Sequence, residues 1–259
     1  MKTIQIIIIF IIFLSQTVMS QIHKELVLYK DGDATLEGYI AYDESLVNTR
    51  PGVLVVHEYF GLNDYAKMRC DMLAKLGYFA FAADIYGKGV LAKTPEEAGK
   101  LAGIYRSDRN LMRSRINSAL TEMKKQKLVD ADKIAVIGYC FGGTTAIELG
   151  LSGADIKGIV SFHGGLEFPN SEDFKNIKGK VLICHGSDDP YATLDALMKV
   201  QTQLKEAGVN YQINIYSGAV HSFSNPASGS DPSKGVAYNE QADKRSWEAM
   251  KDFFAEIFK

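Results

Sequence analysis

The segment from Gly138 to Gly143 places a cysteine in the setting of a nucleophile. Its sequence, Gly-Tyr-Cys-Phe-Gly-Gly, directly follows the apolar run at residues 134–137. The pattern predicts a strand, a sharp turn at Cys140 and then a helix, which is the G-x-S-x-G nucleophile elbow with Cys in place of Ser. Glycines two positions before and after the nucleophile leave room for a strained turn. The N–H groups and the positive dipole end of the helix favour the thiolate of Cys140.

A cysteine nucleophile needs a general base, and the base needs a carboxylate that orients it. In α/β-hydrolases the chain order is nucleophile, acid, histidine. Asp188 and Asp189 follow the apolar run at residues 181–184, and His221 is the histidine beyond them. His221 is therefore the predicted base. Asp189 is preferred as the acid because it completes the phrase H-G-x-x-D, and Asp188 stays open as the alternative.

A second candidate segment is His57-Glu58-Tyr59, which follows the apolar run at residues 53–56. The α/β-hydrolase fold places one oxyanion-hole donor at this point of the chain. We therefore predict that the backbone N–H groups of Tyr59 and Phe141 hold the developing oxyanion. Removing one such donor costs about 3–4 kcal/mol, so the pair contributes several kcal/mol. Glu58 would either disfavour a nearby thiolate by charge repulsion or accept the thiol proton.

The elements that must position these residues alternate along the chain. Strands at residues 25–29 and 36–42 are expected to form a hairpin. Further strands are predicted at 53–56, 78–83, 133–137, 156–162, 181–185 and 211–216, with helices starting near 63, 94, 107, 141, 192 and 239. Such alternation predicts the α/β class: an α/β-hydrolase fold whose mostly parallel central sheet has helices on both faces. The irregular stretch at residues 224–238 is either an active-site lid or a plain surface loop.

Length and composition are those of an ordinary globular protein, with 259 residues, 46% hydrophobic and 23% charged, and a formal net charge of −2. This is enough for one sizeable core, and we predict a single domain over residues 21–259. No basic stripe is present, so nucleic acid is not an expected partner. No ligand cluster with metal spacing is visible, and we expect neither a metal nor an organic cofactor. We expect a monomer or a small homo-oligomer.

The first twenty residues have the pattern of a secretory signal peptide. Lys2 gives a positive charge, residues 4–14 are apolar apart from Gln5, and Val18 and Ser20 place small residues before a cleavage point after Ser20. The apolar run is about half the ~20 residues that a spanning helix needs, so cleavage is preferred to an uncleaved anchor. We expect an exported protein, periplasmic or secreted, without membrane contact after cleavage.

Three cysteines, Cys70, Cys140 and Cys184, are an odd count that cannot form a complete set of disulfides. Cys70 and Cys184 fall in a predicted helix and a predicted buried strand. Both are expected to be small core residues, with a bridge between them as the less favoured alternative.

Taken together, these segments resemble the dienelactone hydrolase family. The run from His57 to Asn63 is similar to the family's E-x-x-G-x-N segment, and the elbow matches its G-[FY]-C-x-G-G pattern. The resemblance covers essentially the whole mature chain. It implies an enzyme that opens lactones or esters with a triad of Cys140, Asp189 and His221. It also implies that Glu58 interacts with the resting thiol and takes its proton when substrate binds.

The sequence departs from the best-known members of the family where they bind the substrate carboxylate. Those members use two arginines, and Lys88 and Asn225 stand at the corresponding positions here. Lys88 is predicted to bind substrate, as a point charge rather than a fork, whereas Asn225 carries no charge. The substrate is therefore expected to differ from a muconate-type dienelactone.

We predict an exported hydrolase that cleaves a small-molecule ester or lactone through a thioester on Cys140. A peptidase or amidase on the same fold is one alternative, which a panel of aryl esters and aryl amides would separate. The other is a noncatalytic binding or thiol-sensing protein, which a full triad with Glu58 disfavours.

Overall fold

The computed structural model describes residues 21–259, and the predicted signal peptide at residues 1–20 lies outside the described residues. The strands are β1 (Ile22–Asp31), β2 (Ala34–Asp43), β3 (Arg50–Val56), β4 (Phe79–Ala83), β5 (Val129–Tyr139), β6 (Gly158–Phe162), β7 (Lys180–Gly186) and β8 (Tyr211–Tyr216). They form one sheet within these residues, in the order β1-β2-β4-β3-β5-β6-β7-β8. Strand β2 pairs antiparallel with β1 and β4, and the other neighbours pair in parallel.

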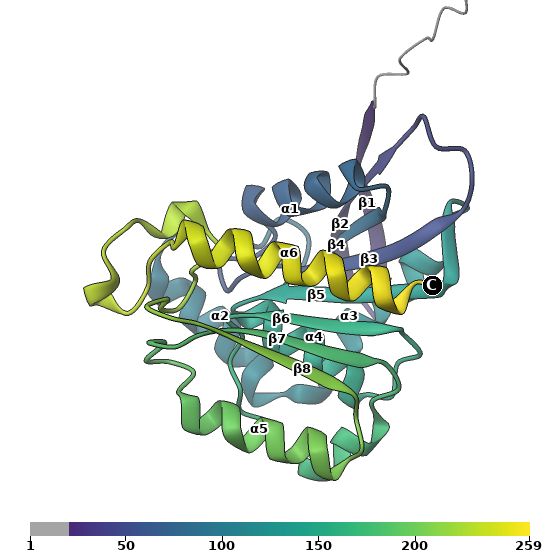
Figure 1. The fold of residues 1–259 in the computed structure, drawn as a ribbon. Helices are drawn as coiled ribbons and strands as arrows, with labels where there is room; N and C mark the ends of the chain where they lie inside the picture. Colours follow the sequence, from purple (N-terminus) through teal and green to yellow (C-terminus); the bar gives the residue numbers. More distant parts are fainter. Residues whose placement is uncertain (1–20) are drawn as a thin grey trace, which may run out of the picture.

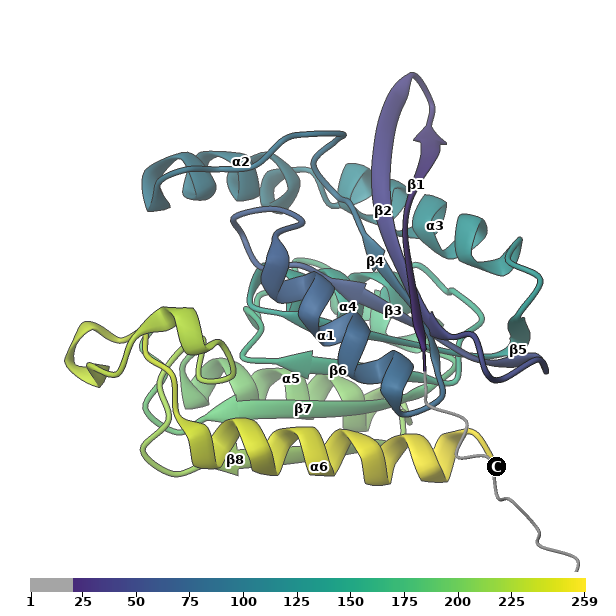
Figure 2. The ribbon, with the colours of Figure 1, turned by 90° about the horizontal axis from the view of Figure 1, so that it is seen from above.

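Helices cover both faces of this sheet (Figure 1, Figure 2). One face carries α1 (Asp64–Lys75) and α6 (Glu240–Ile257), whose buried side chains share one apolar cluster. The other face carries α2 (Pro95–Ser107), α3 (Arg109–Lys124), α4 (Phe141–Leu151) and α5 (Leu194–Glu206). The predicted fold class is confirmed. Among residues 21–259, no helix is both long and apolar enough to cross a bilayer.

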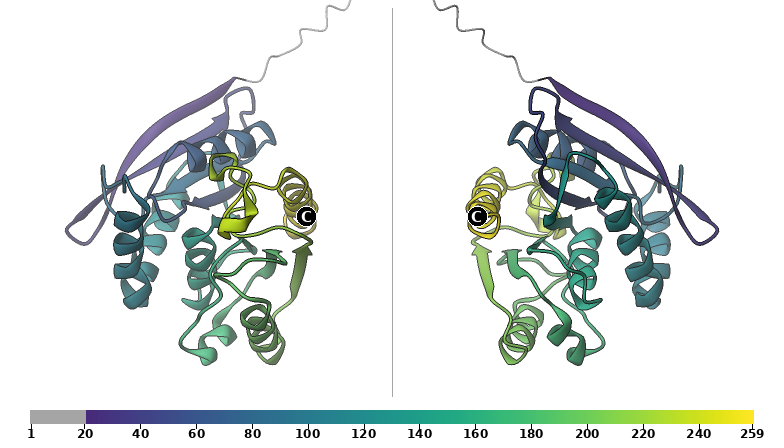
Figure 3. Two further views of the ribbon diagram at one scale, coloured as in Figure 1. Left: turned by 90° about the vertical axis from the view of Figure 1, so that its left-hand side faces the viewer. Right: turned by 90° about the vertical axis from the view of Figure 1, so that its right-hand side faces the viewer.

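The central strands form where the sequence has continuous apolar runs. Residues 53–56 of β3 are fully buried, as expected for a parallel strand covered on both faces. Strand β5 begins earlier than the apolar run predicts, because Val129 and Asp130 pair with Arg50 and Pro51 before a shift in register. The hairpin of β1 and β2 lies at one edge of the sheet and α5 lies toward the other (Figure 3).

Residues with short polar side chains cap the helices and set where they begin. Asn63, Thr94 and Asn239 accept a backbone hydrogen bond at the first turns of α1, α2 and α6. Asp108 ends α2 and caps α3 through its side chain, which separates two helices that are almost continuous in sequence. The described part of the chain also contains three short 3-10 turns: η1 (Ser171–Asn176), η2 (Pro226–Ser228) and η3 (Pro232–Lys234).

The parallel strands bring the candidate residues to one edge of the sheet. Glu58 follows the end of β3, Cys140 the end of β5, Asp189 the end of β7 and His221 the end of β8. Because β3, β5, β7 and β8 run in the same direction, their carboxyl ends lie together. Open α/β sheets bind their ligands at this edge.

Two glycines set the space at the turn between β5 and α4. A Cβ atom at Gly138 would lie 1.9 Å from the carbonyl oxygen of Gly142. A Cβ atom at Gly142 would lie 2.3 Å from the carbonyl oxygen of Val56 in β3. Both obstacles are backbone atoms, so no side-chain rotation relieves them. The start of α4 therefore packs directly on the backbone of β3 and β5.

We expect Gly138→Ala to destabilise the fold by about 1–3 kcal/mol or more, since overpacking at a backbone contact forces the chain to shift. Gly103→Ala in α2 is the matched control, because nothing lies within 4 Å of its added Cβ atom. Alanine there is expected to stabilise the helix by up to about 1 kcal/mol. Thermal and urea unfolding of the two variants measures the difference. Equal stability of the two variants would contradict this account of the elbow.

Candidate active site

Cys140 occupies the sharp turn between β5 and α4. Its backbone has φ 54° and ψ −115°, a conformation that non-glycine residues rarely adopt and that is typical of strained functional positions. Phe141 is the first residue of α4, so its backbone N–H has no acceptor within the helix. The predicted order of strand, turn and helix is therefore confirmed.

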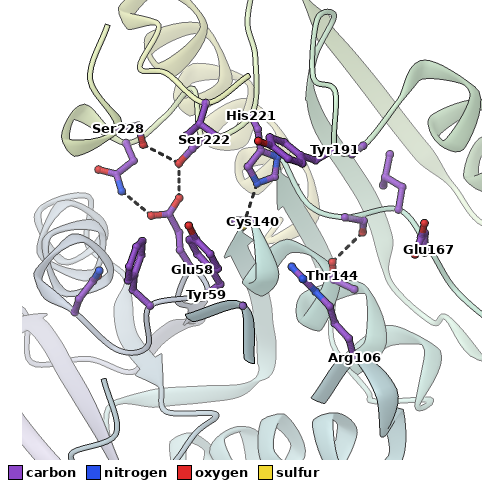
Figure 4. A pocket seen from close by; sticks show the side chains of 18 of the residues that line it. Glu58, Tyr59, Arg106, Cys140, Thr144, Glu167, Tyr191, His221, Ser222 and Ser228 are labelled. Atoms are coloured by element: carbon purple, nitrogen blue, oxygen red, sulfur yellow. Dashed lines mark hydrogen bonds between the residues drawn. The ribbon is translucent and has the colours of Figure 1, made fainter. Parts of the chain in front are cut away.

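The structure joins Cys140, His221 and Asp189 through two contacts of the His221 ring. Figure 4 shows the contact between His221 and Cys140. The Nε2 atom of His221 lies 3.0 Å from Sγ of Cys140, and its Nδ1 atom lies 2.8 Å from Oδ2 of Asp189. The second oxygen of Asp189 accepts the backbone N–H groups of Tyr191 at 2.8 Å and Ala192 at 3.0 Å. Asp188 instead accepts the hydroxyl of its exposed neighbour Ser187. Asp189 is thus the carboxylate that contacts the histidine.

Charged and hydrogen-bonded neighbours shift the pKa values of His221 and Asp189. Burial alone lowers the pKa of His221, but the negative charge of Cys140 and the hydrogen bond to Asp189 outweigh it and raise the pKa well above its usual value. Burial alone raises the pKa of Asp189, but its hydrogen bond and charge interaction with His221 lower it below the usual value. The geometry therefore favours a protonated His221 beside the carboxylate of Asp189.

The peptide group between Glu58 and Tyr59 is held by His57. The Nδ1–H of His57 donates to the carbonyl oxygen of Glu58 at 2.6 Å, and its Nε2 accepts the backbone N–H of Ile85 at 3.3 Å. Burial lowers the pKa of His57, which keeps the ring neutral in this tautomer. Because a trans peptide points its C=O and N–H in opposite directions, the N–H of Tyr59 points away from the His57 ring.

That N–H is available to a ligand. No group in residues 21–259 accepts a hydrogen bond from the backbone N–H of Tyr59, and Tyr59 lines the pocket that contains Cys140. The hydroxyl of Tyr86 donates to the carbonyl oxygen of Tyr59 at 3.0 Å. This hydrogen bond also fixes the orientation of the peptide group between Tyr59 and Phe60. Tyr59 and Phe141 therefore present two unpaired backbone donors near the sulfur, as an oxyanion hole requires.

Glu58 is buried and does not contact the thiol. Its Oε1 accepts the hydroxyl of Ser222 at 2.6 Å, and its Oε2 accepts the side-chain N–H of Asn225 at 2.5 Å (Figure 4). Burial raises the pKa of Glu58, and these two hydrogen bonds only partly oppose that effect. Ser228 in turn donates to Ser222 at 3.0 Å. Glu58 thus ties the loop after β8 to the end of β3.

The pocket in front of Cys140 has a volume of about 620 Å³. The aromatic side chains of Tyr59, Phe60 and Tyr191 line one part of it, and Arg106 and Arg109 line another. The loop at residues 224–238 contributes four further lining residues, so it forms part of the pocket wall: Asn225, Ala227, Ser228 and Val236. Within residues 21–259, no group of three His, Cys, Asp or Glu side chains could hold a metal ion.

Lys88, predicted to bind substrate, does not line this pocket. Its backbone N–H donates to the carbonyl oxygen of Thr35 at 2.9 Å, which draws this segment onto the hairpin of β1 and β2. Its ammonium group then lies 3.4 Å from the carboxylate of Glu37 in β2. The structure places Arg106 and Arg109 in the pocket instead. Sequence reasoning missed them because the directions of α2, which carries Arg106, and of α3, which carries Arg109, are not local properties of the sequence.

A buried histidine that sequence reasoning also missed contacts the backbone of Cys140. Nδ1 of His163 accepts the backbone N–H of Cys140 at 3.1 Å, and Nε2 lies 2.7 Å from Oγ of Ser224. Burial, followed by the charges of His221 and Arg69, lowers the pKa of His163 well below its usual value. The ring is therefore neutral, with Nδ1 as acceptor and Nε2–H as donor to Ser224.

This contact belongs to a network that reaches α6. The hydroxyl groups of Ser224 and Tyr65 lie 2.7 Å apart. Arg69 donates to the carbonyl oxygen of Ser224 at 2.6 Å and to the carboxylate of Asp243 at 2.5 Å. The elbow, α1, α6 and the loop after β8 are thus joined through buried polar groups, all of which have partners along this path.

The other two cysteines lie away from the pocket. Cys70 in α1 and Cys184 in β7 are buried and free, so the structure contains no bridge between them. Burial raises the pKa of both thiols, which keeps them protonated and unreactive.

A sheet of this topology, with a nucleophile elbow after β5 and an acid and a histidine after later parallel strands, defines an α/β-hydrolase. The model of the dienelactone hydrolase family matches residues 36–258. The chain therefore belongs to the dienelactone hydrolase family, and it is a hydrolase of lactones or esters.

Known proteins agree with this assignment. The solved structure of m3DLH is 40% identical and has a TM-score of 0.89, covering 92% of this chain and 99% of its own. A dienelactone hydrolase-like promiscuous phosphotriesterase from metagenomic libraries is 39% identical with a TM-score of 0.87, covering 91% of this chain and 98% of its own. A carboxymethylenebutenolidase homolog of Mus musculus is 27% identical, covering 69% of this chain and 73% of its own.

The raised pKa of His221 can be tested with two neighbouring aspartates. We expect Asp189→Asn to lower the pKa of His221, since a raising interaction is lost, and Asp188→Asn to leave it unchanged. NMR titration of the imidazole measures both. A raised folded-state pKa stabilises the fold below the unfolded value of about 6.5, and this contribution is lost as pH rises through the folded-state pKa. The same pKa of His221 in both variants would refute the arrangement.

Proposed function

We propose that this protein is an exported hydrolase that cleaves ester or lactone bonds through a thioester on Cys140. The observation that carries the proposal is the pair of contacts from His221, at 3.0 Å to the sulfur and 2.8 Å to Asp189. An imidazole held in this way by a carboxylate serves as base and acid for an adjacent nucleophile. The pocket in front of the sulfur has room for a small-molecule substrate.

In the acylation step, the Cys140 thiolate attacks the acyl carbon and the carbonyl electrons move onto oxygen. The backbone N–H groups of Tyr59 and Phe141 stabilise this oxyanion. When the tetrahedral intermediate collapses, the C–O bond of the ester or lactone breaks and the imidazolium of His221 gives its proton to the leaving oxygen.

In the deacylation step, neutral His221 removes a proton from water as the oxygen of that water attacks the thioester. The C–S bond then breaks and releases the carboxylic acid. The thiolate and imidazolium return to their starting forms, while Asp189 keeps the Nδ1–H of His221 in place throughout. The cycle consumes one water molecule.

Glu58 enters this proposal through the family resemblance, as the group that takes the thiol proton of Cys140 when substrate binds and so leaves the thiolate that starts the acylation step. It lines the same pocket as Cys140. Its carboxylate is engaged by Ser222 and Asn225, so contact with the thiol requires exchange of one of these partners. The sulfur is also shielded, since Cys140 is only 7% exposed. Shielding suits a free thiol in an oxidising compartment.

The promiscuous phosphotriesterase that is 39% identical to this chain supports a second class of test substrate. We propose neutral phosphotriesters as a side activity of the same site, with phosphorus in place of the acyl carbon.

We expect Cys140→Ala to lower hydrolysis of 4-nitrophenyl acetate and small lactones by about 10³-fold or more, because the nucleophile is lost. The assay uses the chain from Gln21 onward, with the corresponding anilides to detect amidase activity. Cys184→Ala is the matched control, since this buried cysteine lies outside the pocket. Equal activity of the wild type and Cys140→Ala would remove the thiol from the mechanism. Faster cleavage of anilides than of esters would favour the amidase alternative.

Export can be tested on the full chain in a bacterial host. We expect intact-mass analysis to show a processed protein that begins at Gln21 in the periplasm or medium, because cleavage is predicted after Ser20. Replacing Ile8 with Arg should block processing, since it interrupts the apolar run. An unprocessed wild-type chain confined to the cytoplasm would contradict the proposal of export.

A further inference from the structure

Helix α2 carries two glycines in its interior, Gly99 and Gly103. Glycine destabilises a helix interior relative to alanine, because it loses more backbone freedom on folding. Neither residue has the positive φ that would favour glycine. No atom of residues 21–259 would lie within 4 Å of a Cβ atom added at either position, so neither glycine makes room for a neighbouring element. A side chain would therefore fit at both positions and would strengthen the helix.

One of these glycines faces the pocket that contains Cys140. Gly99 lines this pocket, whereas Gly103 is not among the described residues that line it. Arg106 lies seven residues after Gly99 and also lines the pocket. Seven residues are close to two helical turns, so both positions lie on the same face of α2. Because Figure 4 shows the side chain of Arg106 extending toward Thr144, a side chain at Gly99 would also extend to the pocket side of α2.

Gly99 belongs to the outer part of the pocket. It is exposed, whereas Cys140 is only 7% exposed. Phe60 lies near the start of α2, because its carbonyl oxygen accepts the backbone N–H of Ala92 at 3.0 Å shortly before the helix begins. The rings of Phe60 and Tyr59 pack edge to face with their centroids 4.6 Å apart, and both residues line the pocket. The pocket thus extends from the thiol to a part of α2 without a side chain, with aromatic rings along its wall.

We propose that Gly99 keeps the outer pocket open for a bulky apolar group of the substrate. The inference rests on the proposed function, because it places the scissile bond at Cys140. A pocket of about 620 Å³ holds a drug-sized ligand, so an acetyl ester would fill only part of it. An aromatic ring can pack on the exposed backbone of Gly99, which a side chain at that position would cover. The substrate class is thus an ester or lactone with a large apolar substituent near the scissile bond.

Three esters of different bulk test this proposal. Methyl acetate has no bulky group, phenyl acetate has one on the alcohol side, and methyl 3-phenylpropanoate has one on the acyl side. Gly99→Leu should lower kcat/KM for at least one of the two bulky esters about 10- to 100-fold, because the added side chain overpacks the occupied pocket. Methyl acetate should lose less than about twofold, since it is too small to reach α2. Release of acid at constant pH measures all three reactions.

Gly103→Leu is the matched control for this experiment. It adds the same side chain about one turn further along α2, at a position outside the pocket lining, and should leave activity on all three esters unchanged. Equal losses on all three esters in Gly99→Leu, or the same selective loss in Gly103→Leu, would make the effect structural and overturn the proposal. Unchanged activity of Gly99→Leu on both bulky esters would overturn it as well.

The thermal stability of a smaller variant gives a readout that a damaged fold would not produce. Gly99→Ala should raise Tm by up to about 2–4 °C, since alanine strengthens the interior of the helix. The same variant should lower kcat/KM for a bulky ester, by a smaller factor than Gly99→Leu does. Gly103→Ala should raise Tm by a similar amount without loss of activity. A lowered Tm in Gly99→Ala would show that the fold itself requires this glycine, and would contradict the proposal.

Alkylation of Cys140 separates this proposal from the proposed function. Iodoacetamide is a small reagent, whereas iodoacetanilide carries an aromatic ring on the same reactive group. Gly99→Leu should slow the reaction of Cys140 with iodoacetanilide about 10- to 100-fold more than its reaction with iodoacetamide. This readout needs no turnover, so a wild type that hydrolyses no ester, with this selective slowing in the variant, would refute only the proposed function. Equal slowing with both reagents, or no slowing with iodoacetanilide, would refute the role of Gly99.

Discussion

The close contact of α4 with the backbone of β3 and β5 is the constraint on which the site depends. It is possible only because Gly138 and Gly142 lack side chains that would meet backbone atoms at 1.9 Å and 2.3 Å. This contact holds Cys140 at φ 54° and leaves the N–H of Phe141 unpaired at the start of a helix. The strained turn at Cys140, the helix dipole at its side and the unpaired N–H of Phe141 therefore follow from a single packing arrangement.

Around that turn, each reactive group is oriented by a buried partner. Asp189 orients His221, and His57 orients the peptide that ends in the N–H of Tyr59. His163 accepts the N–H of Cys140 and links it to the loop after β8. Both of these supporting histidines have pKa values lowered by burial, so they stay neutral beside a charged His221. Of the three histidines His57, His163 and His221, only His221 has a raised pKa.

Most of the fold could be predicted from the sequence, and so could the grouping of Cys140, Asp189 and His221. The reasons are physical. Apolar runs such as residues 53–56 identify strands buried on both faces, and parallel strands must bring Cys140, Asp189 and His221 to one edge. Two features depended on contacts far apart in the chain and could not be predicted. Lys88 lies outside the pocket because of a hydrogen bond to Thr35, and His163 meets Ser224 only through the tertiary fold.

The central claim is that the acyl group is carried by Cys140, and the most direct measurement is mass spectrometry of the rapidly quenched enzyme during turnover of 4-nitrophenyl acetate. The account predicts a mass increase of one acetyl group on the peptide that contains Cys140, which disappears as substrate is consumed. An acetyl group on another residue, or turnover at full rate with Cys140 never acylated under conditions that trap thioesters, would contradict it.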